Sequence, residues 1–328
     1  MQVRETDALI RQSEWPLVCV IILNLNGKTH LEYSLPSFAD SDYPHCEWIL
    51  LDNGSTDGSV KYACDHFPSI TVIQNEINLG WAAGNNVGIQ YALEHGAHYI
   101  VLQNNDTMVH PQWLSAAVQV CEANPRIGIV GFTMLQEYVQ GEDPDGERFR
   151  ALSESWREAA YERAEHVTGA ALFVRTSVFR DIGLIDEGYF AYGEEDDFER
   201  RARRAGYEMV RLNVPLWHYN GGFWRKHFLR SSVLAMRNNI RCMLKNDSPA
   251  SIWRQLNWMV RFVCRPGITF DTRIPHFRRL RPSNFVVNTA ILMYAFVWNL
   301  IHLPATLETR REDARRIAQA RRRWDSVA

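Results

Sequence analysis

Apolar residues in the first 132 positions gather into short continuous runs rather than into an alternating pattern. The five runs have strand length, are rich in Val, Ile and Leu, and end on polar residues; they are Leu17–Asn24, Glu47–Asn53, Ile70–Asn75, Tyr99–Asp106 and Ile127–Phe132. Parallel strands that are buried on both faces have this pattern. Helix-like segments follow the first four runs, near His30–Ala39, Ser59–His66, Ala83–His95 and Gln112–Asn124. The alternation predicts an α/β fold with a Rossmann-like, doubly wound, mostly parallel sheet.

The pattern changes after Phe132. Residues 136–166 are polar with weak periodicity, and we interpret them as a mobile loop or insertion that acts as a lid. Strand-like patterning resumes at Val167–Arg175 and Glu208–Leu212, and Arg225–Lys245 has the character of a helix. We therefore expect a main domain over residues 1–225 and a helical C-terminal extension over residues 226–328.

Polar residues collect where the predicted strands end: Asn24, Asp52, Asn53, Asn104, Asn105 and Asp106. Ligands of doubly wound sheets bind beyond the carboxyl ends of the strands, so these side chains predict a binding site. A carboxylate at Asp52 is placed to accept a hydrogen bond from a nucleobase or a ribose hydroxyl group. An Asx-turn that closes the strand fits the sequence DNGSTDGS equally well.

A divalent metal site is predicted at the same edge. Asp106 directly follows a buried strand, where a carboxylate can hold Mg²⁺ or Mn²⁺ together with waters and substrate phosphates. His218 lies between the last predicted strand and Gly221-Gly222, and its imidazole is a second candidate ligand. The alternative for His218 is a structural histidine that only satisfies hydrogen bonds, and the two interpretations have equal weight.

The sequence NLGWAAGNNVG, residues 78–88, is rich in glycine. Gly80 and Gly84 would let the backbone come close to a phosphate group. The spacing matches neither GxGxxG nor GxxxxGK[ST], which excludes the dinucleotide-binding and P-loop fingerprints. By itself this turn is a weak indication of a nucleotide site.

Four consecutive acids, Glu194–Asp197, lie between the sequence GYFAYG and the helix-like run FERRARRAG. Acids at the start of a helix and bases at its end complement the helix macrodipole, which explains one or two of the four. Four carboxylates repel one another unless a cation, a proton or a substrate relieves the repulsion. Because such groups are typical of active sites, we expect a catalytic carboxylate in this stretch.

Composition narrows the classes of function. Apolar residues make up 46% and charged residues 23% of the chain, which suits a globular protein with a normal core. A net charge of −2 argues against nucleic-acid binding by overall electrostatic attraction. The six cysteines show no metal-binding spacing and fit a reducing compartment, and residues 1–14 lack the apolar stretch of a secretory signal.

The C-terminal part contains a long apolar segment, Phe285–Leu303, followed by seven arginines between residues 310 and 323. As a helix its 19 residues would extend about 28 Å, close to the thickness of a bilayer core. Asn288, Asn299 and His302 count against a clean span, and Pro304 ends it. We favour a helix that packs on the domain or lies in the membrane interface; a true span and a homodimer or partner contact are the alternatives.

Seven of these stretches resemble, in order and spacing, the family 2 glycosyltransferases, most of all the bacterial rhamnosyltransferase-like branch that builds cell-surface polysaccharide. They are VCVIILNLNG, LLDNGSTDGS, NLGWAAGNNVGI, LQNNDT, TGAALFVR, IDEGYFAYGEEDDFERRARRAGY and WHYNGG, and the resemblance covers residues 17–245. It implies a GT-A fold, a nucleotide-diphospho-sugar donor, Mg²⁺ or Mn²⁺ as cofactor, and inversion by single displacement. It also implies a glycan or lipid-linked acceptor and a location in the cytoplasm at the inner face of the cell membrane.

The resemblance assigns roles to individual residues. Nucleotide-sugar binding falls to Asn24, Asp52, Asn53, Gly80, Gly84, Asn85 and Asn105. The resemblance assigns metal binding to Asp106, which matches the last position of the family's DxD motif, and to His218. Asn104 occupies the position where many members have the first Asp, so we expect the metal to bind more weakly. Glu195 matches the acidic base; the neighbouring acids of its catalytic group are Glu194, Asp196 and Asp197, of which Glu194 and Asp197 support it.

Two other functions compete with glycosyl transfer. A nucleotidyltransferase shares a similar sheet and metal site but normally shows a Gly-rich, Lys/Arg-bearing signature after the first strand, which NLNGKTH matches poorly. A catalytically degenerate nucleotide-sugar binder is the second alternative, and Asn104 is the residue that suggests it.

Overall fold

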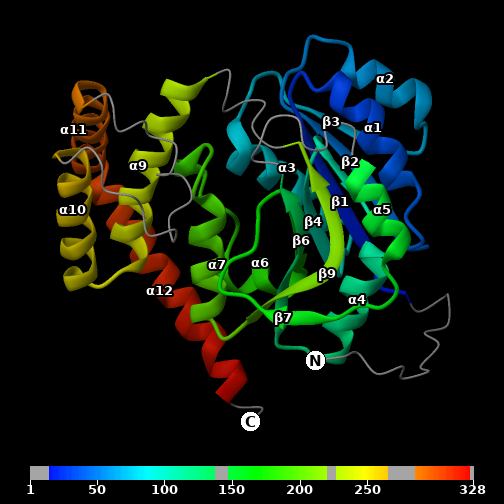
Figure 1. Ribbon diagram of the computed structural model, residues 1–328. Coiled ribbons are helices and arrows are strands. Elements are labelled where there is room, and N and C mark those ends of the chain that lie inside the picture. The colour runs from blue at the N-terminus through cyan, green and yellow to red at the C-terminus, as the bar shows by residue number, and fades with distance from the viewer. Residues whose placement is uncertain (1–14, 137–146, 220–226, 265–284, 326–328) are drawn as a thin grey trace.

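A computed structural model describes residues 15–136, 147–219, 227–264 and 285–325 of the 328-residue chain. Nine strands of this part form one mixed sheet (Figure 1). They are β1 Val18–Asn24, β2 Cys46–Asp52, β3 Thr71–Gln74, β4 Tyr99–Asn104, β5 Thr107–Val109, β6 Ile127–Gln136, β7 Tyr161–Arg163, β8 Ala171–Arg175 and β9 Glu208–His218. All five predicted runs are therefore strands.

The sheet has the order β3-β2-β1-β4-β8-β6-β9-β5, with β7 also paired to β9. Strands β1 to β4 run parallel, and β6 runs parallel to β9. Strand β8 enters between β4 and β6 and is antiparallel to both. The mostly parallel α/β sheet predicted from the sequence is confirmed.

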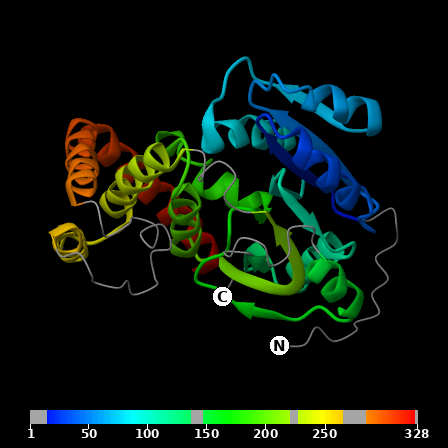
Figure 2. The same cartoon turned by 45° about the horizontal axis from the view of Figure 1, so that its top comes forward.

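Helices cover both faces of this sheet (Figures 1 and 2). Helices α1, α2 and α4 contribute to the core on one face, and α3, α6 and α7 to the core on the other. Along β1, Val18 and Val20 point into the first core whereas Cys19 and Ile21 point into the second. Because both faces are buried, these strands carry continuous apolar runs. The bounds are α1 Lys28–Ala39, α2 Ser59–His66, α3 Gly80–Glu94, α4 Trp113–Ala123, α5 Glu147–Ser155, α6 Thr176–Ile182 and α7 Glu194–Arg204.

Part of the polar segment 136–166, which the sequence predicted to be a loop acting as a lid, forms a helix and a strand. Residues 137–146 lie outside the described residues, but Glu147–Ser155 forms α5 and Tyr161–Arg163 forms β7, which pairs with β9. Helix α5 buries Phe149 in a small cluster with Met108 and Trp217. A single apolar contact of this kind leaves little periodicity, which is why the sequence predicted a loop.

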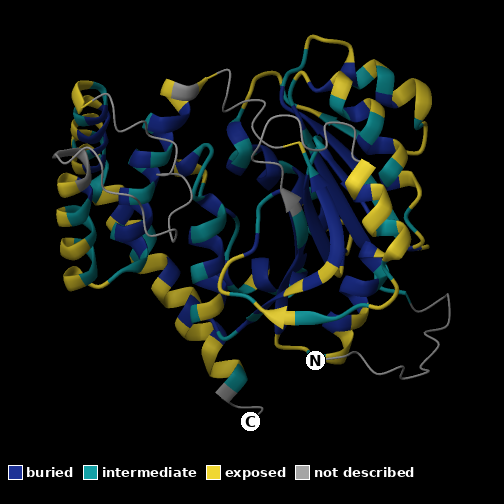
Figure 3. Cartoon of the chain, viewed as in Figure 1, coloured by how far each residue is buried: buried dark blue, intermediate teal, exposed yellow. Residues whose placement is uncertain are grey.

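Four helices form the C-terminal extension: α9 Phe228–Asn246, α10 Pro249–Cys264, α11 Phe285–Ile301 and α12 Leu303–Asp325. The boundary expected at residue 225 lies outside the described residues. Helices α9, α10 and α11 share an apolar core, whereas α12 reaches back to the sheet and buries Ile317 and Ala320 beside α6 and α7. Outward faces of α10, α11 and α12 are exposed in Figure 3.

No individual helix among the described residues combines the length and the apolar character that crossing a bilayer requires. Helices α11 and α12 meet that requirement only as a pair, bent by 66° at their junction. Pro304 occupies the first turn of α12, where the missing N–H of proline is tolerated, so the predicted end of the apolar helix is a sharp bend between two helices.

Candidate functional site

The ends of β1, β2 and β4 meet at one edge of the sheet. Asn24 is in register with Asp52, and the preceding residue of β1, Leu23, pairs with Asn104. The buried Asn24 amide donates to Asp52 Oδ1 at 2.9 Å and accepts from Asn105 Nδ2 at 2.7 Å. The other Asp52 oxygen accepts the backbone N–H of Ser55 at 2.9 Å, so the Asx-turn is present. These residues form one internal hydrogen-bonded group, as their positions at strand ends predicted.

Asn53 links this group to the start of α3. Its amide donates to the Gly80 carbonyl at 2.9 Å and its oxygen accepts from Asn75 at 2.9 Å. A Cβ added to Gly84 would lie 2.8 Å from Asn53 Nδ2, so glycine is needed for this packing. Asn85 is buried, and its Oδ1 has no hydrogen-bond partner within the described residues.

The N-terminus of α3 is closed by the chain itself. The Phe190 carbonyl accepts from Trp81 N at 2.6 Å and from Ala82 N at 3.3 Å, and Asn78 Oδ1 accepts from Gly80 N at 2.8 Å. A Cβ at Gly80, whose φ is +85°, would lie 2.5 Å from the Phe190 oxygen. In this conformation the glycine-rich turn makes its close approach to the Phe190 carbonyl, which accepts two of the first helical N–H groups.

Asp106 and His218 are adjacent at the metal site predicted from the sequence. Strand β5 pairs Thr107 with His218, and Asp106 Oδ1 lies 3.1 Å from His218 Nε2. The two side chains are only 16% and 12% exposed, so a cation between them would be largely shielded from water. Burial raises the pKa of the Asp106 carboxyl, but His218 and the charge of His30 more than offset it, and the pKa lies below its ordinary value. The carboxylate is therefore ionised at neutral pH.

A hard divalent cation fits these donors. A carboxylate, an imidazole and the Oδ1 atom of Asn104 are ligand types that Mg²⁺ or Mn²⁺ accepts, with remaining positions left to water and phosphate. His218 Nδ1 is buried and has no partner within the described residues, so the ring is not locked by a second hydrogen bond. Asn104 Oδ1 accepts a 3.3 Å hydrogen bond from Trp81 Nε1, which holds it at the same edge.

The four acids at the start of α7 have different environments. Glu194 is buried, and its Oε2 has no partner within the described residues. Burial, together with the charge of Glu195, raises the pKa of Glu194 well above its ordinary value. Glu195 is partly exposed, and its Oε2 accepts the backbone N–H of Gly193 at 3.2 Å.

The next two acids make ion pairs. Asp196 accepts from Arg200 at 3.1 Å. Asp197 is fully buried and accepts from Arg201, Lys245 and Asn246 at 2.8–3.0 Å. Burial raises the pKa of Asp197, but Arg201 and Lys245 outweigh it and hold the pKa well below its ordinary value. No oxygen of Asp197 reaches solvent, so within the predicted catalytic group Asp197 is placed as a structural support.

Glu195 and the strand-end residues border the same short segment, residues 166–170. A Cβ at Gly169 would lie 3.8 Å from Glu195 Cβ and Cγ and 3.6 Å from the Trp81 ring. Trp81 in turn donates to Asn104, and the Asn104 N–H donates to the Ala170 carbonyl at 2.9 Å. The acid at residue 195 is therefore linked through Gly169 and Trp81 to Asn104, which lies two residues before Asp106 in the sequence.

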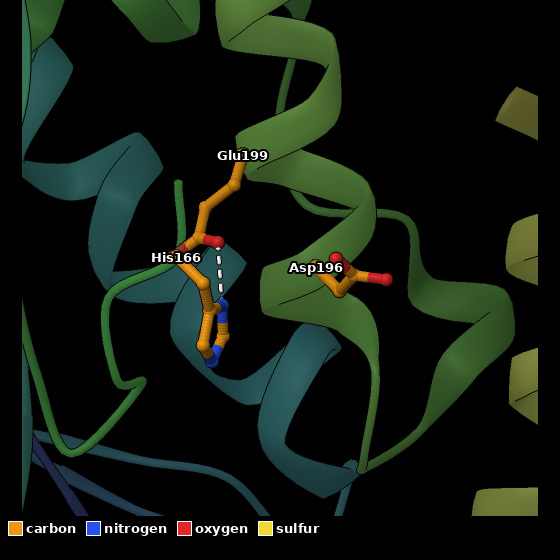
Figure 4. A group of neighbouring side chains, drawn as sticks. All are labelled: His166, Asp196 and Glu199. Atoms are coloured by element: carbon orange, nitrogen blue, oxygen red, sulfur yellow. Dashed lines mark hydrogen bonds and ion pairs between the residues drawn. The ribbon is translucent and has the colours of Figure 1, made fainter. Parts of the chain in front are cut away.

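A second group of metal-type donors consists of His166, Asp196 and Glu199, whose ligand atoms lie within 4.8 Å of one another (Figure 4). His166 Nδ1 and Glu199 Oε2 are 2.7 Å apart, and the other Glu199 oxygen accepts from Val167 N. Burial lowers the pKa of His166, but Glu199 outweighs it and raises the pKa to about 9. Burial raises the pKa of Glu199 to about 7. The pair thus retains a proton, and Asp196 already neighbours Arg200, so this group suits a cation less well than Asp106 and His218.

Several residues at this site lacked any signal in the sequence. Phe190 and Tyr192 have φ values of 65° and 74°, in the left-handed region where the sequence offers no glycine. Lys245 pairs with Asp197 from a helix 48 residues further on. Only the aromatic-rich character of GYFAYG next to the acids could have suggested that this loop is special.

Three comparisons with known proteins bear on this site. Residues 19–183 match the family model described as Glycosyl transferase family 2. The N-acetylglucosaminyl-diphospho-decaprenol L-rhamnosyltransferase of Mycobacterium tuberculosis is 24% identical over 280 residues, which cover 74% of this chain and 88% of the relative.

Two solved structures share the fold. The mannosyltransferase PcManGT from Pyrobaculum calidifontis, in complex with GDP-Man and Mn²⁺, superposes with a TM-score of 0.52 at 16% identity and covers 96% of this chain and 84% of its own. The structure of S. aureus TarS 1-349 gives a TM-score of 0.53 at 15% identity, covering 95% of this chain and 92% of its own.

Proposed function

Because the chain belongs to glycosyl transferase family 2 and is a glycosyltransferase, we propose that it transfers a sugar from a nucleoside-diphosphate donor to a lipid-linked glycan of the cell surface, with inversion and with a divalent metal. The mycobacterial relative is by name an L-rhamnosyltransferase acting on a diphospho-decaprenol lipid, so rhamnose is the first sugar to test. The arrangement that supports the proposal is the closeness of Glu195 to Gly169 and Trp81, together with the hydrogen bond from Trp81 to Asn104, which lies two residues before the Asp106 that contacts His218.

Glu195 is the proposed general base. An acceptor hydroxyl is a poor nucleophile, so a carboxylate must remove its proton as the oxygen attacks the anomeric carbon. The new carbon–oxygen bond forms while the bond from that carbon to the diphosphate breaks, the proton passes to Glu195, and the nucleoside diphosphate leaves. Attack opposite the leaving group inverts the anomeric centre. Of the four acids, Glu195 is the one that is partly exposed and forms no ion pair with an arginine or lysine within the described part of the chain.

The donor side would be formed by the strand ends. Asp106, His218 and Asn104 would hold Mg²⁺ or Mn²⁺, which when bound neutralises the charge that develops on the leaving diphosphate. Asn24, Asp52, Asn53 and Asn105 form the hydrogen-bonded edge against which the nucleoside would lie. Because Asn104 is neutral, we expect weaker metal binding than two aspartates would give.

Glu195→Gln tests the assignment of the base. The amide keeps the size of the side chain but cannot accept the proton, so turnover should fall about 10²- to 10⁴-fold while the dissociation constant of the donor stays within threefold. Glu94→Gln, an exposed acid at the end of α3, is the matched control and should retain full turnover. Retention of turnover by E195Q would remove Glu195 from the mechanism, and a wild-type chain that binds donor but never transfers it would favour the degenerate binder.

A thermal-shift screen of nucleotide sugars, with and without Mn²⁺, identifies the donor. At a free concentration 100 times its dissociation constant, the true donor should stabilise the protein by about 2.7 kcal/mol. dTDP-, UDP- and GDP-linked sugars form the panel, with the free sugars as controls. Release of pyrophosphate instead of a nucleoside diphosphate in the following assay would assign the chain to nucleotidyl transfer.

A second part of the proposal concerns the membrane. Residues 1–225 would bind donor and catalyse transfer, and residues 226–328 would attach the protein peripherally to the inner face of the membrane, where a lipid-linked acceptor lies. Helix α11 contains no charged residue and presents Val286, Met293, Val297 and Leu300 along one face, each 51–74% exposed. Helix α12, with its seven arginines, follows directly and would attract anionic lipid.

Sedimentation with lipid vesicles tests this attachment. The wild-type chain should bind vesicles that contain phosphatidylglycerol and bind pure phosphatidylcholine more weakly, since both apolar burial and charge contribute. Exchange of Val297 and Leu300 for Glu should abolish binding, whereas Leu152→Glu on α5, also an exposed apolar residue, should not. A lipid-free dimer that the same double exchange converts to a monomer would instead assign this face to a second copy of the chain.

A further inference from the structure

The loop Tyr189–Gly193 joins the short helix Glu187–Tyr189 to α7 and has an unusual backbone. Phe190 and Tyr192 have φ values of 65° and 74°, and Gly193 has 91°. Side chains other than glycine adopt the left-handed region at a cost in free energy, so such residues persist only where surrounding contacts impose them. Something outside the loop must therefore hold this conformation.

The loop connects the two halves of the proposed active site. On one side the Phe190 carbonyl accepts from Trp81 N and Ala82 N in the first turn of α3. On the other side the Gly193 N–H donates to Glu195 Oε2 at 3.2 Å. The orientation of the peptide group between Tyr192 and Gly193 thus sets one of the contacts of the proposed base.

A single side chain of α9 holds the carbonyl groups of this loop. The Asn238 amide is fully buried, and its Nδ2 lies 2.8 Å from the carbonyl oxygens of Tyr189, Ala191 and Tyr192. Its Oδ1 accepts from Arg237 Nε at 2.8 Å, which orients the amide with its donor toward the loop.

Arg237 completes this arrangement. Its Nη2 donates to the Tyr189 carbonyl at 2.7 Å, and its guanidinium lies 4.3 Å from the ring centroid of Trp298 on α11. Asn299 of α11 donates to the Arg237 carbonyl at 2.9 Å. The contacts therefore run from α11 through Arg237 and Asn238 to the loop.

The peptide group between Tyr192 and Gly193 contacts both Asn238 and Glu195. Its C=O, from Tyr192, accepts from Asn238, and its N–H, from Gly193, donates to Glu195. Asparagine is a poor residue for a helix interior, and an apolar residue of similar size would remove this donor from the Ala191 and Tyr192 carbonyl groups, whereas that of Tyr189 also accepts from Arg237. The amide of Asn238 is therefore needed to hold the loop and not to stabilise α9 itself.

We propose that Asn238 is a positioning residue for sugar transfer: it fixes the Tyr192–Gly193 peptide group, and through it Glu195, so that the C-terminal helices complete the active site. This inference rests on the proposed role of Glu195 as the general base. It assigns to α9 a part in the reaction beyond packing and membrane attachment.

Asn238→Asp is the sharpest test, because it keeps the shape and replaces the donor by an acceptor. At pH 8 turnover should fall at least tenfold, while the dissociation constant of the matching nucleoside diphosphate (UDP, GDP or dTDP) stays within threefold. Burial beside the loop carbonyl groups would raise the pKa of the introduced carboxyl, against the opposing effect of the Arg237 guanidinium. Its protonated form regains one O–H donor, so the ratio of variant to wild-type turnover should rise several-fold between pH 8 and pH 6.

Asn239→Asp is the matched control, since Asn239 is the next residue of α9, is partly exposed, and makes no hydrogen bond to the loop within the described part of the chain. It should leave turnover and its pH dependence unchanged. Hydrogen exchange of the peptide that covers residues 187–195 gives a readout independent of activity: N238D should exchange at least tenfold faster there, and N239D should not.

The outcomes separate this inference from the proposed function. Wild-type turnover in N238D, or a loss that is equal at pH 6 and pH 8 and follows a fall in melting temperature, would reduce Asn238 to a structural role. E195Q in the same assay reports on the base alone. If E195Q is inactive and N238D is fully active, only the positioning role is wrong; if E195Q is active, the proposed base fails whatever N238D does.

Discussion

The two sides of the proposed active site are built from different contacts. At the strand ends, Asn24, Asn53 and Asn105 connect neighbouring strands and turns through neutral amides. At α7, the buried Asp197 is held by charged partners, Arg201 from its own helix and Lys245 from α9. Lys245 also pairs with Asp186 and with Asp313 of α12.

This difference indicates how each side reaches its geometry. Parallel strands already place their carboxyl ends together, so short side chains, mostly amides together with the carboxylate of Asp52, suffice to join them. Helix α7 is not held in place by strand pairing. Ion pairs with residues distant in the sequence, such as Lys245, fix its position instead. Burying several ions costs desolvation free energy and is tolerated because their partners are present. Removing a partner on the α7 side should therefore cost stability, whereas changes at the strand ends should mainly affect ligands.

The largest effect is expected for Lys245→Met, which leaves Asp197 and Asp186 without their shared cation. Loss of one partner of a buried ion pair costs about 3–5 kcal/mol of unfolding free energy. The folded pKa of Asp197 lies below its unfolded value, so its contribution is fully present above about pH 4 and is lost as the pH falls through the folded value. The deficit of K245M should accordingly be largest at neutral pH in urea unfolding and shrink in acid.

Lys61→Met is the control for that measurement. Lys61 also pairs with an aspartate, Asp65, but its side chain is 79% exposed, and solvent screens such pairs so that they contribute little to stability. Equal losses in K61M and K245M would show that the buried network does not hold α7 and would remove the contrast between the two sides.

Asp106→Asn tests the strand-end side. Without ligand, its unfolding free energy should change by less than about 1.5 kcal/mol, because only the hydrogen-bonded contact with His218 is altered and the amide oxygen can still accept from it. With Mn²⁺ and donor, a tenfold weaker complex would reduce the stabilisation from about 2.7 to about 1.4 kcal/mol. Thermal unfolding with and without ligand measures both, and Asp65→Asn serves as the control. An unchanged ligand-induced shift would place the metal elsewhere, with the group around His166 as the next candidate.

The smallest effect is expected for His166→Gln. The folded pair of His166 and Glu199 binds more protons than the unfolded chain, since their pKa values are raised to about 9 and about 7. The stability that protonated His166 contributes is therefore present below its unfolded pKa near 6.5 and lost as the pH rises through about 9. Because the histidine is half exposed, screening reduces this to about 1 kcal/mol.

Urea unfolding of the wild type and H166Q at pH 6.5 and pH 9.5 measures this difference. The variant should be less stable at the lower pH and equal to the wild type at the higher one. A difference that grows with pH would contradict the assigned protonation of the pair.

The strand-end residues could be predicted because each lies at the end of an apolar run. Burial on both faces leaves a continuous apolar signal along β1, and topology then brings Asn24, Asp52 and Asn104 to one edge. Local pattern and the geometry of parallel sheets contain this information, so the sequence predicted it. Asp106 and His218 instead meet through the antiparallel pairing of β5 with β9, which the alternating pattern did not contain.

The α7 side could be predicted only in part. Four identical charges at a helix start are visible in the sequence, but their burial depends on what packs against each face of the helix. Glu195 is partly exposed and Asp197 fully buried although they are two residues apart, because residues on a helix are separated by about 100°. The sequence around Asp197 does not predict its ion pair with Lys245, and the sequence GYFAYG does not predict its hydrogen bonds with Asn238.

By itself the sequence determined the parallel sheet, the positions of its polar ends, the helical extension and the family of the chain, since these depend on periodicity and on motifs that are contiguous. The tertiary structure alone decided which acid is accessible, which carbonyl closes the start of α3, and which side chain of α9 holds the loop beside Glu195. These contacts join segments about 50 to 100 residues apart, and a hydrogen bond across such a separation leaves no periodic trace in either segment.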